Sequence, residues 1–220
     1  MLLSAAMSAD GYINDASGTR LVLSDAADLD RVDELRSGSD AILVGAQTIR
    51  ADNPGLLVRS PARRRRRAEH GKPPSPRKVT VTRTGDLDAR SLFFADADPP
   101  PLVYAPALAL DDVAARLSAV ALVVAAPSAG AAGGLDLPWL LADLAARGVG
   151  RLMVEGGSSI LAQFLSAGAA DEFLLAVAPV FVADRSAPRL LEGAPAAGRM
   201  VLAGVSQAGD MAVLRYLPAR

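Results

Sequence analysis

The sequence predicts a three-layer α/β/α domain whose central sheet is mixed but mostly parallel. Two observations carry this prediction. Short apolar runs alternate with segments of helical pattern along most of the chain, and the last two runs follow each other with no helix between them. Alternating strands and helices build parallel sheets, whereas two directly connected strands pair antiparallel. We therefore expect a parallel sheet that ends in a C-terminal antiparallel hairpin.

The expected strands are short apolar runs that are continuous rather than alternating, as in strands covered on both faces. They cover residues 2–8, 41–45, 78–82, 102–105, 121–125, 152–155, 172–180, 200–206 and 211–216. Gly209 and Asp210 lie between the last two runs and are typical residues of a hairpin turn. The hairpin is therefore expected to turn at this pair.

Three helices are expected between these strands, each with recognisable ends. They cover residues 25–37, 137–147 and 158–167. Ser24 is a suitable N-cap for the first helix, because its hydroxyl can accept a backbone hydrogen bond. Pro138 is tolerated at the start of the second, and Gly148 and Gly168 end the second and the third.

The composition excludes several function classes. The chain has 220 residues, a net charge of −1, no cysteine and a single histidine, His70. Disulfides and cysteine-rich zinc sites, including that of a zinc deaminase, are excluded, and a Ser-His-Asp site is disfavoured. No run is long and apolar enough to span a membrane, and the charge does not suggest nucleic-acid binding. We expect a cytoplasmic protein that binds neither membrane nor nucleic acid.

The basic run Arg63–Arg67 lies in a polar stretch rich in proline. Such a composition is typical of a solvated, mobile loop, and we expect one over residues 60–77 within a single domain of residues 1–220. The alternative is a flap that attracts phosphate to a nearby site.

Two junctions could bind anions. In the first, an apolar strand ends at Glu155, and Gly156, Gly157, Ser158 and Ser159 open a helix. Glycines let the backbone approach a ligand, and a helix N-terminus offers free N–H groups to a phosphate. Glu155 would lie at the carboxyl end of a strand, where α/β sheets place ligands. The alternative is a tight turn with an exposed glutamate.

The second junction joins the strand ending at Gly45 to a helix with Thr48 in its first turn. Two such junctions suit a ligand with more than one phosphate, such as a dinucleotide. The alternative is a plain capped helix.

Two arginines are candidate anion clamps. Arg36 lies near the apolar stripe of its helix, where an arginine needs a partner. That partner is either a ligand phosphate or one of the carboxylates of Asp33 and Asp40. Arg59 follows a turn at residues 52–55 and is either a second clamp or a surface residue.

Several short segments of this sequence match, in their order and spacing, the pattern of a known protein family. They are Met7-Ser8-Ala9-Asp10-Gly11, Val44-Gly45-Ala46-Gln47-Thr48, Asp52-Asn53-Pro54, Val58-Arg59, Val154-Glu155-Gly156-Gly157, Asp171-Glu172 and Ala178-Pro179. The ordered set resembles the pyrimidine reductase of riboflavin biosynthesis, which has a dihydrofolate-reductase-like fold. In bacteria this reductase is often fused to a zinc deaminase, but from the cysteine count and the length of this chain we expect a stand-alone reductase.

The resemblance implies hydride transfer from NADPH to C1′ of a ribosylaminopyrimidine 5′-phosphate by a homodimeric enzyme. It implies substrate contacts at Arg20, Arg36, Leu56, Arg59 and Glu155, with Glu155 as the catalytic candidate. With the glycine junctions, the expected cofactor contacts are Ala6, Val22, Gly45, Thr48, Asp52, Gly156, Gly157, Ser158, Ser159, Ile160 and Leu161. Whether the base is the 2,5-diaminopyrimidinone or the aminouracil stays open.

The chain also departs from the family pattern. Ser4 stands where bacterial fused enzymes carry a lysine, Arg20 and Val22 replace a serine and a tryptophan of some members, and Ala183 stands where a glycine is usual. Two alternatives therefore stay open. One is a reductase of another pterin-like or secondary-metabolite substrate, and the other is a non-catalytic NADP(H)-binding protein.

Overall fold

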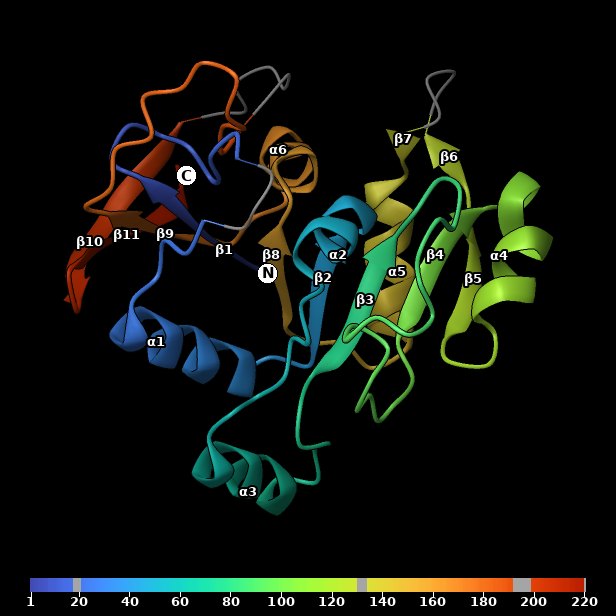
Figure 1. The fold of residues 1–220 in the computed structure, drawn as a ribbon. Helices are drawn as coiled ribbons and strands as arrows, with labels where there is room; N and C mark the ends of the chain where they lie inside the picture. Colours follow the sequence, from blue (N-terminus) through green and yellow to red (C-terminus); the bar gives the residue numbers. More distant parts are fainter. Residues whose placement is uncertain (18–20, 130–133, 192–198, 220) are drawn as a thin grey trace. The chain divides into compact units, whose positions relative to one another are not determined.

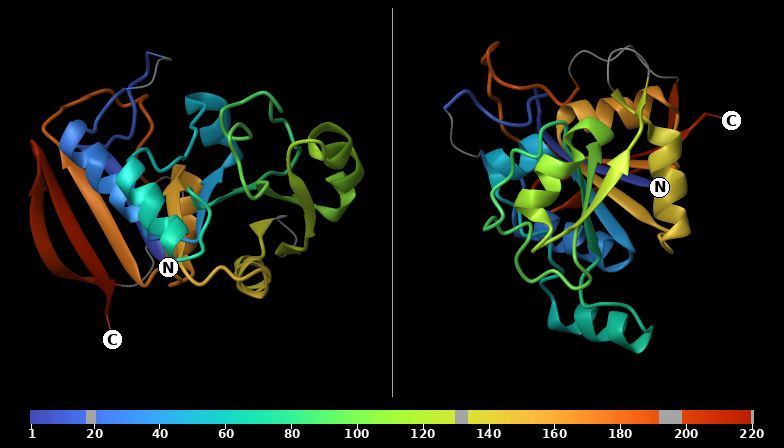
Figure 2. Two further views of the ribbon diagram at one scale, coloured as in Figure 1. Left: turned by 90° about the horizontal axis from the view of Figure 1, so that it is seen from below. Right: turned by 90° about the vertical axis from the view of Figure 1, so that its right-hand side faces the viewer.

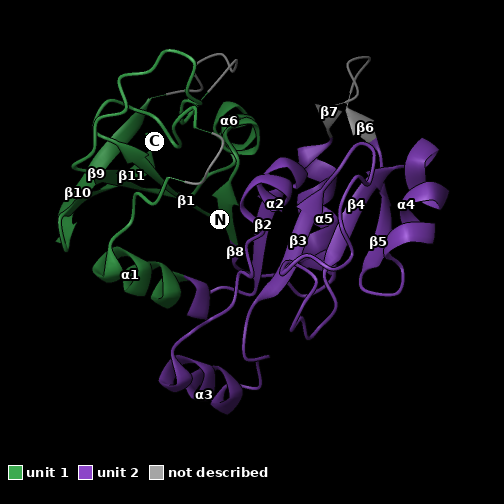
Figure 3. Cartoon of the chain, in the orientation of Figure 1, with its two compact units in different colours: residues 1–35, 153–220 green, residues 36–152 purple. Residues whose placement is uncertain are grey.

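The computed structural model describes residues 1–17, 21–129, 134–191 and 199–219 (Figure 1). The chain divides into two compact units, shown in different colours in Figure 3. Unit 1 comprises Met1–Leu35 and Met153–Arg220, and unit 2 comprises Arg36–Leu152. This division does not test the expected single domain, which stays a prediction.

The predicted fold class is confirmed. Within the described ranges, nine strands form one mixed, mostly parallel sheet, accompanied by helices. A short second sheet pairs β6 (Ser128–Ala129) with β7 (Gly134–Leu135). None of the helices in the described part of the chain is both long and apolar enough to cross a membrane.

Unit 1 contains the N-terminal strand and the C-terminal hairpin, with strands in the order β10-β11-β9-β1-β8. These are β1 (Leu2–Ser8), β8 (Leu152–Gly156), β9 (Glu172–Ala178), β10 (Met200–Ala208) and β11 (Met211–Pro218). β1 runs parallel to β8 and β9, whereas β11 runs antiparallel to β9 and β10 (Figures 1 and 2). Gly209 and Asp210 turn the hairpin, as predicted. Helix α6 (Ser158–Ser166) follows β8.

Unit 2 contains four parallel strands in the order β2-β3-β4-β5. These are β2 (Ala41–Gly45), β3 (Arg77–Val81), β4 (Leu102–Pro106) and β5 (Leu122–Ala126). The helices are α2 (Ala46–Asp52), α3 (Pro61–Glu69), η1 (Ala107–Ala109), α4 (Leu110–Leu117) and α5 (Leu137–Ala146). Helix α1 (Ala26–Ser37) lies mostly in unit 1 and ends in unit 2.

Most of the continuous apolar runs became buried strands because both of their faces leave water, but the prediction is wrong for β10, which is mostly exposed, and for β5, which has one buried residue. Every residue of β2 is buried, and Leu3 and Val154 in unit 1 are fully buried. The predicted strand bounds agree closely with the structure, although β3 begins one residue earlier than expected and β9 ends at Ala178. Helix α4 was not predicted, because its short, alanine-rich pattern gives a weak signal.

The N-cap of α1 also differs from the prediction. The carboxylate of Asp25, rather than the hydroxyl of Ser24, accepts a hydrogen bond from the backbone N–H of Asp28 at 2.8 Å. The same carboxylate accepts one from the backbone N–H of Asp210 at 2.8 Å. Asp25 therefore ties the start of α1 to the hairpin turn within unit 1.

The main correction concerns residues 60–77, where the sequence analysis expected a mobile loop. Pro61–Glu69 forms helix α3, and the Ser60 hydroxyl caps it by accepting a hydrogen bond from the Arg63 backbone at 3.4 Å. Arginine is a good helix former, and proline suits the first turn of a helix. The arginine run is therefore part of a capped helix.

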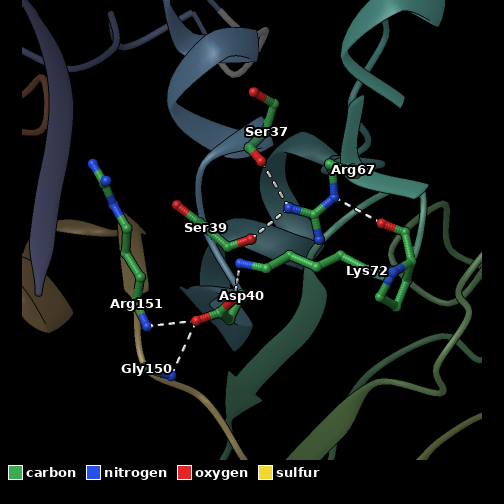
Figure 4. Close-up of polar contacts among 8 residues, drawn as sticks. Ser37, Ser39, Asp40, Arg67, Lys72, Gly150 and Arg151 are labelled. Atoms are coloured by element: carbon green, nitrogen blue, oxygen red, sulfur yellow. Dashed lines mark hydrogen bonds and ion pairs between the residues drawn. The ribbon is translucent and has the colours of Figure 1, made fainter. Parts of the chain in front are cut away.

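Arg67 of α3 is buried, with 3% of its surface exposed. Its guanidinium donates hydrogen bonds to the carbonyl oxygens of Ser37 at 2.8 Å, Ser39 at 2.6 Å and Pro73 at 2.7 Å (Figure 4). These bonds replace the water that a guanidinium loses on burial. Polar composition predicted a solvated run, but one arginine of that run is an internal anchor.

Candidate active site

The turn after β8 has the backbone geometry of a ligand-binding junction. Gly156 is buried with a φ of +124°, and the peptide bond between Gly156 and Gly157 is cis. A Cβ at Gly156 would meet no atom within 4 Å, so the backbone conformation is what requires glycine. The predicted strand–Gly-Gly–helix junction is therefore present, with Glu155 half-buried at its start.

Helix α6 begins directly at this turn, and Gly157 is its N-cap. No side-chain hydrogen bond caps the helix within the described ranges. Ile160, Leu161 and Phe164 are buried and anchor the helix. The first backbone N–H groups of an α-helix have no partner inside the helix. With the hydroxyls of Ser158 and Ser159, this donor set has the chemistry that fits a phosphate.

Strand β1 lies beside this junction in unit 1. Its register with β8 pairs Leu2 with Met153 and Leu3 with Val154, so the following residue, Ser4, adjoins Glu155. Ala6 is half-buried two residues further along β1, on the face of the strand that Ser4 shares. The predicted contacts Ala6, Glu155 and Gly156 thus lie in the carboxyl-terminal halves of two neighbouring parallel strands of unit 1.

Val22 and Arg20 belong to the segment before α1. The side chain of Val22 is 67% exposed. Arg20 lies outside the described residues, so the substrate contact predicted for it stays a prediction.

The second predicted junction lies in unit 2. Gly45 ends β2 and is buried, and α2 begins at the next residue. Thr48 in the first turn and Asp52 at the end of α2 are half-buried. The strand–Gly–helix arrangement predicted from the sequence is present.

The substrate-side candidates in unit 2 gather at one segment. Arg36 donates a hydrogen bond from Nη1 to the carbonyl oxygen of Leu57 at 3.4 Å. Leu56 beside it is 4% exposed and has a φ of 52°. Arg59 is exposed, and its carbonyl oxygen accepts a hydrogen bond from Arg64 at 3.1 Å. The end of α1 and residues 56–59 therefore lie together.

Asp40 was one of the two carboxylates considered as a partner of Arg36. It binds Lys72 at 2.7 Å and accepts hydrogen bonds from the backbone N–H groups of Gly150 at 3.0 Å and Arg151 at 2.7 Å (Figure 4). Burial raises the pKa of the Asp40 carboxyl, but the bonds from Lys72 and Arg151 outweigh it and hold the pKa below its usual value. Asp40 thus remains ionised. It links the segment that follows α3 to the segment that precedes β8.

Asp10 belongs to one of the segments that carry the family resemblance, and its structural role was not predicted from the sequence. Its carboxylate accepts hydrogen bonds from the backbone N–H groups of Val182 at 3.1 Å and Ala183 at 2.8 Å, and from the Ser8 hydroxyl at 2.6 Å. Ala183 has a φ of 55°, at the position where the family usually has glycine. Asp10 therefore fixes the segment after β9 against the end of β1.

The family model of the RibD C-terminal domain matches residues 1–214. A protein of Archaeoglobus fulgidus named 2,5-diamino-6-ribosylamino-4(3H)-pyrimidinone 5′-phosphate reductase is 33% identical over 193 residues, 88% of this chain and 86% of the relative. A protein of the same name from Methanothermobacter thermautotrophicus is also 33% identical over 193 residues, 88% of this chain and 83% of the relative.

A solved structure agrees with this match. A pyrimidine reductase-like protein from Corynebacterium diphtheriae superposes with a TM-score of 0.85 at 27% identity, covering 100% of this chain and 91% of that one. The predicted dihydrofolate-reductase-like fold is confirmed. The relatives are named as pyrimidine reductases, which is an oxidoreductase activity. The chain belongs to the RibD C-terminal domain family, the reductase family of riboflavin biosynthesis that its sequence resembles.

Proposed function

We propose that this chain is an NADPH-dependent reductase that converts a ribosylaminopyrimidine 5′-phosphate into its ribitylamino product. The observation that carries the proposal is the β8–α6 junction, where Glu155, a glycine at a φ of +124° and an uncapped helix start follow one another. The names of the two archaeal relatives favour the 2,5-diaminopyrimidinone as the base, rather than the aminouracil.

Each of the two junctions has residues whose chemistry suits part of a dinucleotide. In unit 1, the N–H groups at the start of α6 and the hydroxyls of Ser158 and Ser159 are donors for one phosphate. In unit 2, Gly45, Thr48 and Asp52 are the further contacts that the resemblance implies. When bound, NADPH supplies the hydride that forms the new C1′–H bond of the substrate.

The chemistry balances with one proton. As the C1′–H bond forms, the C1′–O bond of the ribose ring breaks and the ring oxygen takes up a proton, while NADPH is oxidised to NADP⁺. Glu155 is the proposed group that orients the sugar or moves this proton. It is the second-last residue of β8, a mostly buried strand, so its position is fixed by the sheet rather than by a loop.

Arg36 and Arg59 are the proposed clamps for the substrate 5′-phosphate. A guanidinium forms paired, charge-assisted hydrogen bonds with a phosphate. Arg36 already bonds to the carbonyl oxygen of Leu57, two residues before Arg59, which holds both arginines in one part of unit 2. Holding the phosphate fixes C1′ relative to the hydride donor, which is a positioning effect.

The test is an NADPH-oxidation assay on three compounds: the 2,5-diaminopyrimidinone ribotide, the aminouracil ribotide and dihydrofolate. We expect oxidation with the first, and NADPH deuterated at the transferred position should deliver deuterium to C1′ of the product by mass spectrometry. Oxidation with dihydrofolate alone would select a pterin reductase. Binding of NADPH without turnover of any compound would select a non-catalytic binding protein.

The homodimer and the cytoplasmic location expected above belong to this proposal as well. Light scattering on the purified protein measures its mass directly, and a monomer at micromolar concentration would contradict the dimer. The phosphorylated small molecule is the partner that the relatives' names support.

A further inference from the structure

The segment of residues 56–60, here the clamp segment, carries Arg59 and precedes helix α3 in unit 2. Its backbone is held from outside the segment at two successive residues. The backbone N–H of Val58 donates a hydrogen bond to the Ser75 hydroxyl at 3.0 Å, and the carbonyl oxygen of Arg59 accepts one from Nη2 of Arg64 at 3.1 Å. Arg64 belongs to α3, so the helix bonds directly to a residue that is proposed to bind the substrate phosphate.

The start of α3 supports this contact. The Ser60 hydroxyl caps the helix by accepting a hydrogen bond from the Arg63 backbone at 3.4 Å, and the Ser60 carbonyl oxygen accepts one from the Arg64 backbone at 3.0 Å. Arg64 thus bonds to the clamp segment through its main chain as well as its side chain. Because the helix already fixes the backbone of Arg64, only its side chain has to be ordered when the bond to Arg59 forms.

The other end of α3 bonds to the residues that follow Arg36. Arg66 donates a hydrogen bond from Nη2 to the Ser37 hydroxyl at 2.7 Å. Arg67 donates from Nη1 to the carbonyl oxygens of Ser37 at 2.8 Å and Ser39 at 2.6 Å (Figure 4). Ser37 is adjacent to Arg36, the other proposed phosphate clamp. Helix α3 is therefore bonded to both of the segments that carry a proposed clamp.

Arg36 and Arg59 come from separate segments, and a phosphate that both bind requires their guanidinium groups in one fixed geometry. Arg36 contacts the clamp segment through a hydrogen bond to the Leu57 carbonyl oxygen, which at 3.4 Å is long and therefore weak. The side-chain bonds from α3 to the two segments are shorter, between 2.6 and 3.1 Å. The helix therefore connects the two segments more firmly than this bond does.

We propose that α3 is a brace that positions the two clamps for the substrate 5′-phosphate, and that Arg64 is a positioning residue that acts through Arg59. The basic run thus serves the site through its hydrogen bonds to backbone groups, and not through its positive charge alone. The inference rests on the proposed function and deepens it, because it names the element that fixes the geometry of the phosphate site.

The test measures binding of ribose 5-phosphate by calorimetry, and kcat and KM with the ribosylaminopyrimidine in its phosphorylated and dephosphorylated forms. Arg64→Ala should weaken binding of ribose 5-phosphate and raise KM for the phosphorylated substrate about 3-fold to 10-fold, the range for one lost hydrogen bond. We expect kcat to stay within about twofold and the dephosphorylated substrate to be unaffected. Arg64→Lys, which keeps a charged donor, should lie between the wild type and Arg64→Ala. In an Arg59→Ala background, Arg64→Ala should raise KM no further, because it acts through Arg59.

Arg65→Ala is the matched control, because it removes the same charge from the same helix. The Arg65 side chain is exposed and makes no hydrogen bond or ion pair within the described ranges. It should change neither binding nor KM. If Arg64→Ala has no effect, if it equals Arg65→Ala, or if its effect persists in the Arg59→Ala background, the inference fails and the proposed function stands. If the wild-type protein neither binds ribose 5-phosphate nor reduces the phosphorylated substrate, both fail.

Discussion

Arg67 donates a hydrogen bond of 2.8 Å to the carbonyl oxygen of Ser37, the last residue of α1. The last carbonyl groups of a helix have no partner inside it, and a cation is favourable at that end. Burial lowers the pKa of the Arg67 guanidinium, and the charge of Asp40 partly opposes this shift. The side chain therefore joins α3 to the end of α1 and the start of β2 within unit 2.

Replacing this arginine should destabilise the protein. Arg67→Ala removes three hydrogen bonds to backbone oxygens, two of which are buried, and we expect the free energy of unfolding in urea to fall by about 2–4 kcal/mol. Arg65→Ala on the same helix is the control: its side chain is exposed, and the expected change is within about 0.5 kcal/mol. Equal effects of the two substitutions would show that α3 is held by helix propensity alone.

The hairpin turn should require glycine at position 209 both for its backbone conformation and for its close packing, whereas Gly168, after α6, should be required for its backbone conformation alone. Gly209 has a φ of +58°, and a Cβ there would overlap the carboxylate of Asp25. Gly168 has a φ of +61°, but a Cβ there would meet nothing within 4 Å. Gly168→Ala should therefore cost about 1–2 kcal/mol of unfolding free energy from backbone strain, and Gly209→Ala should cost more. Thermal unfolding compares them, and a smaller effect at Gly209 would argue against the tight contact with Asp25.

Lys78 should make stability depend on pH above neutrality. Its buried ammonium bonds to the carbonyl oxygens of Leu92 at 3.2 Å and Ala95 at 2.7 Å, and burial lowers its pKa from 10.5 to about 8. Between these values the unfolded chain holds the proton and the folded protein does not. The contribution of Lys78 to stability therefore rises with pH from about 8 to 10.5, by up to about 3 kcal/mol.

Lys78→Met removes this titration and keeps the side-chain volume. We expect the unfolding free energy of the wild type minus that of the variant to increase between about pH 8 and pH 10 in denaturant titrations. A difference that stays flat or decreases over this window would mean that the folded protein keeps Lys78 charged.

Arg59 should affect the substrate more than the cofactor. Arg59→Ala should raise KM for the phosphorylated pyrimidine about 10-fold or more, the range for a lost charged hydrogen bond, with the NADPH dissociation constant unchanged. Arg65→Ala again serves as the control. Unchanged KM in Arg59→Ala would contradict the assignment of the substrate phosphate to this residue.

Glu155 should affect the chemical step. Glu155→Gln keeps the shape of the side chain and removes its charge, so we expect kcat to fall by about 100-fold, as for loss of a group that moves a proton. The dissociation constant of NADPH, measured by fluorescence, should stay within about twofold. Glu172→Gln is a control at the start of β9, where Glu172 pairs with Arg215 at 2.6 Å. A loss of NADPH binding in Glu155→Gln would place Glu155 on the cofactor side.

Local sequence predicted much of the architecture. β2 was predictable because a continuous apolar run favours a strand that is covered on both faces, and all of its residues are buried. The junction at Glu155, Gly156 and Gly157 was predictable because an apolar strand followed by two glycines and a helical pattern leaves few alternatives. Gly209 and Asp210 were predictable for the same reason, since the turn chemistry lies within the pair itself.

Other features were decided by partners distant in sequence. The sequence predicts that Arg67 is solvated, because it lies beside four other arginines. It becomes a buried anchor only through its hydrogen bonds to the carbonyl groups of Ser37 and Ser39. Asp25 caps α1 and binds the turn at Asp210, which lies at the other end of the chain. The sequence by itself thus determined where chain segments are apolar, helical or bent, because those properties arise from neighbouring residues. The tertiary structure alone decided which polar groups are buried and paired, because their partners come together only when the chain has folded.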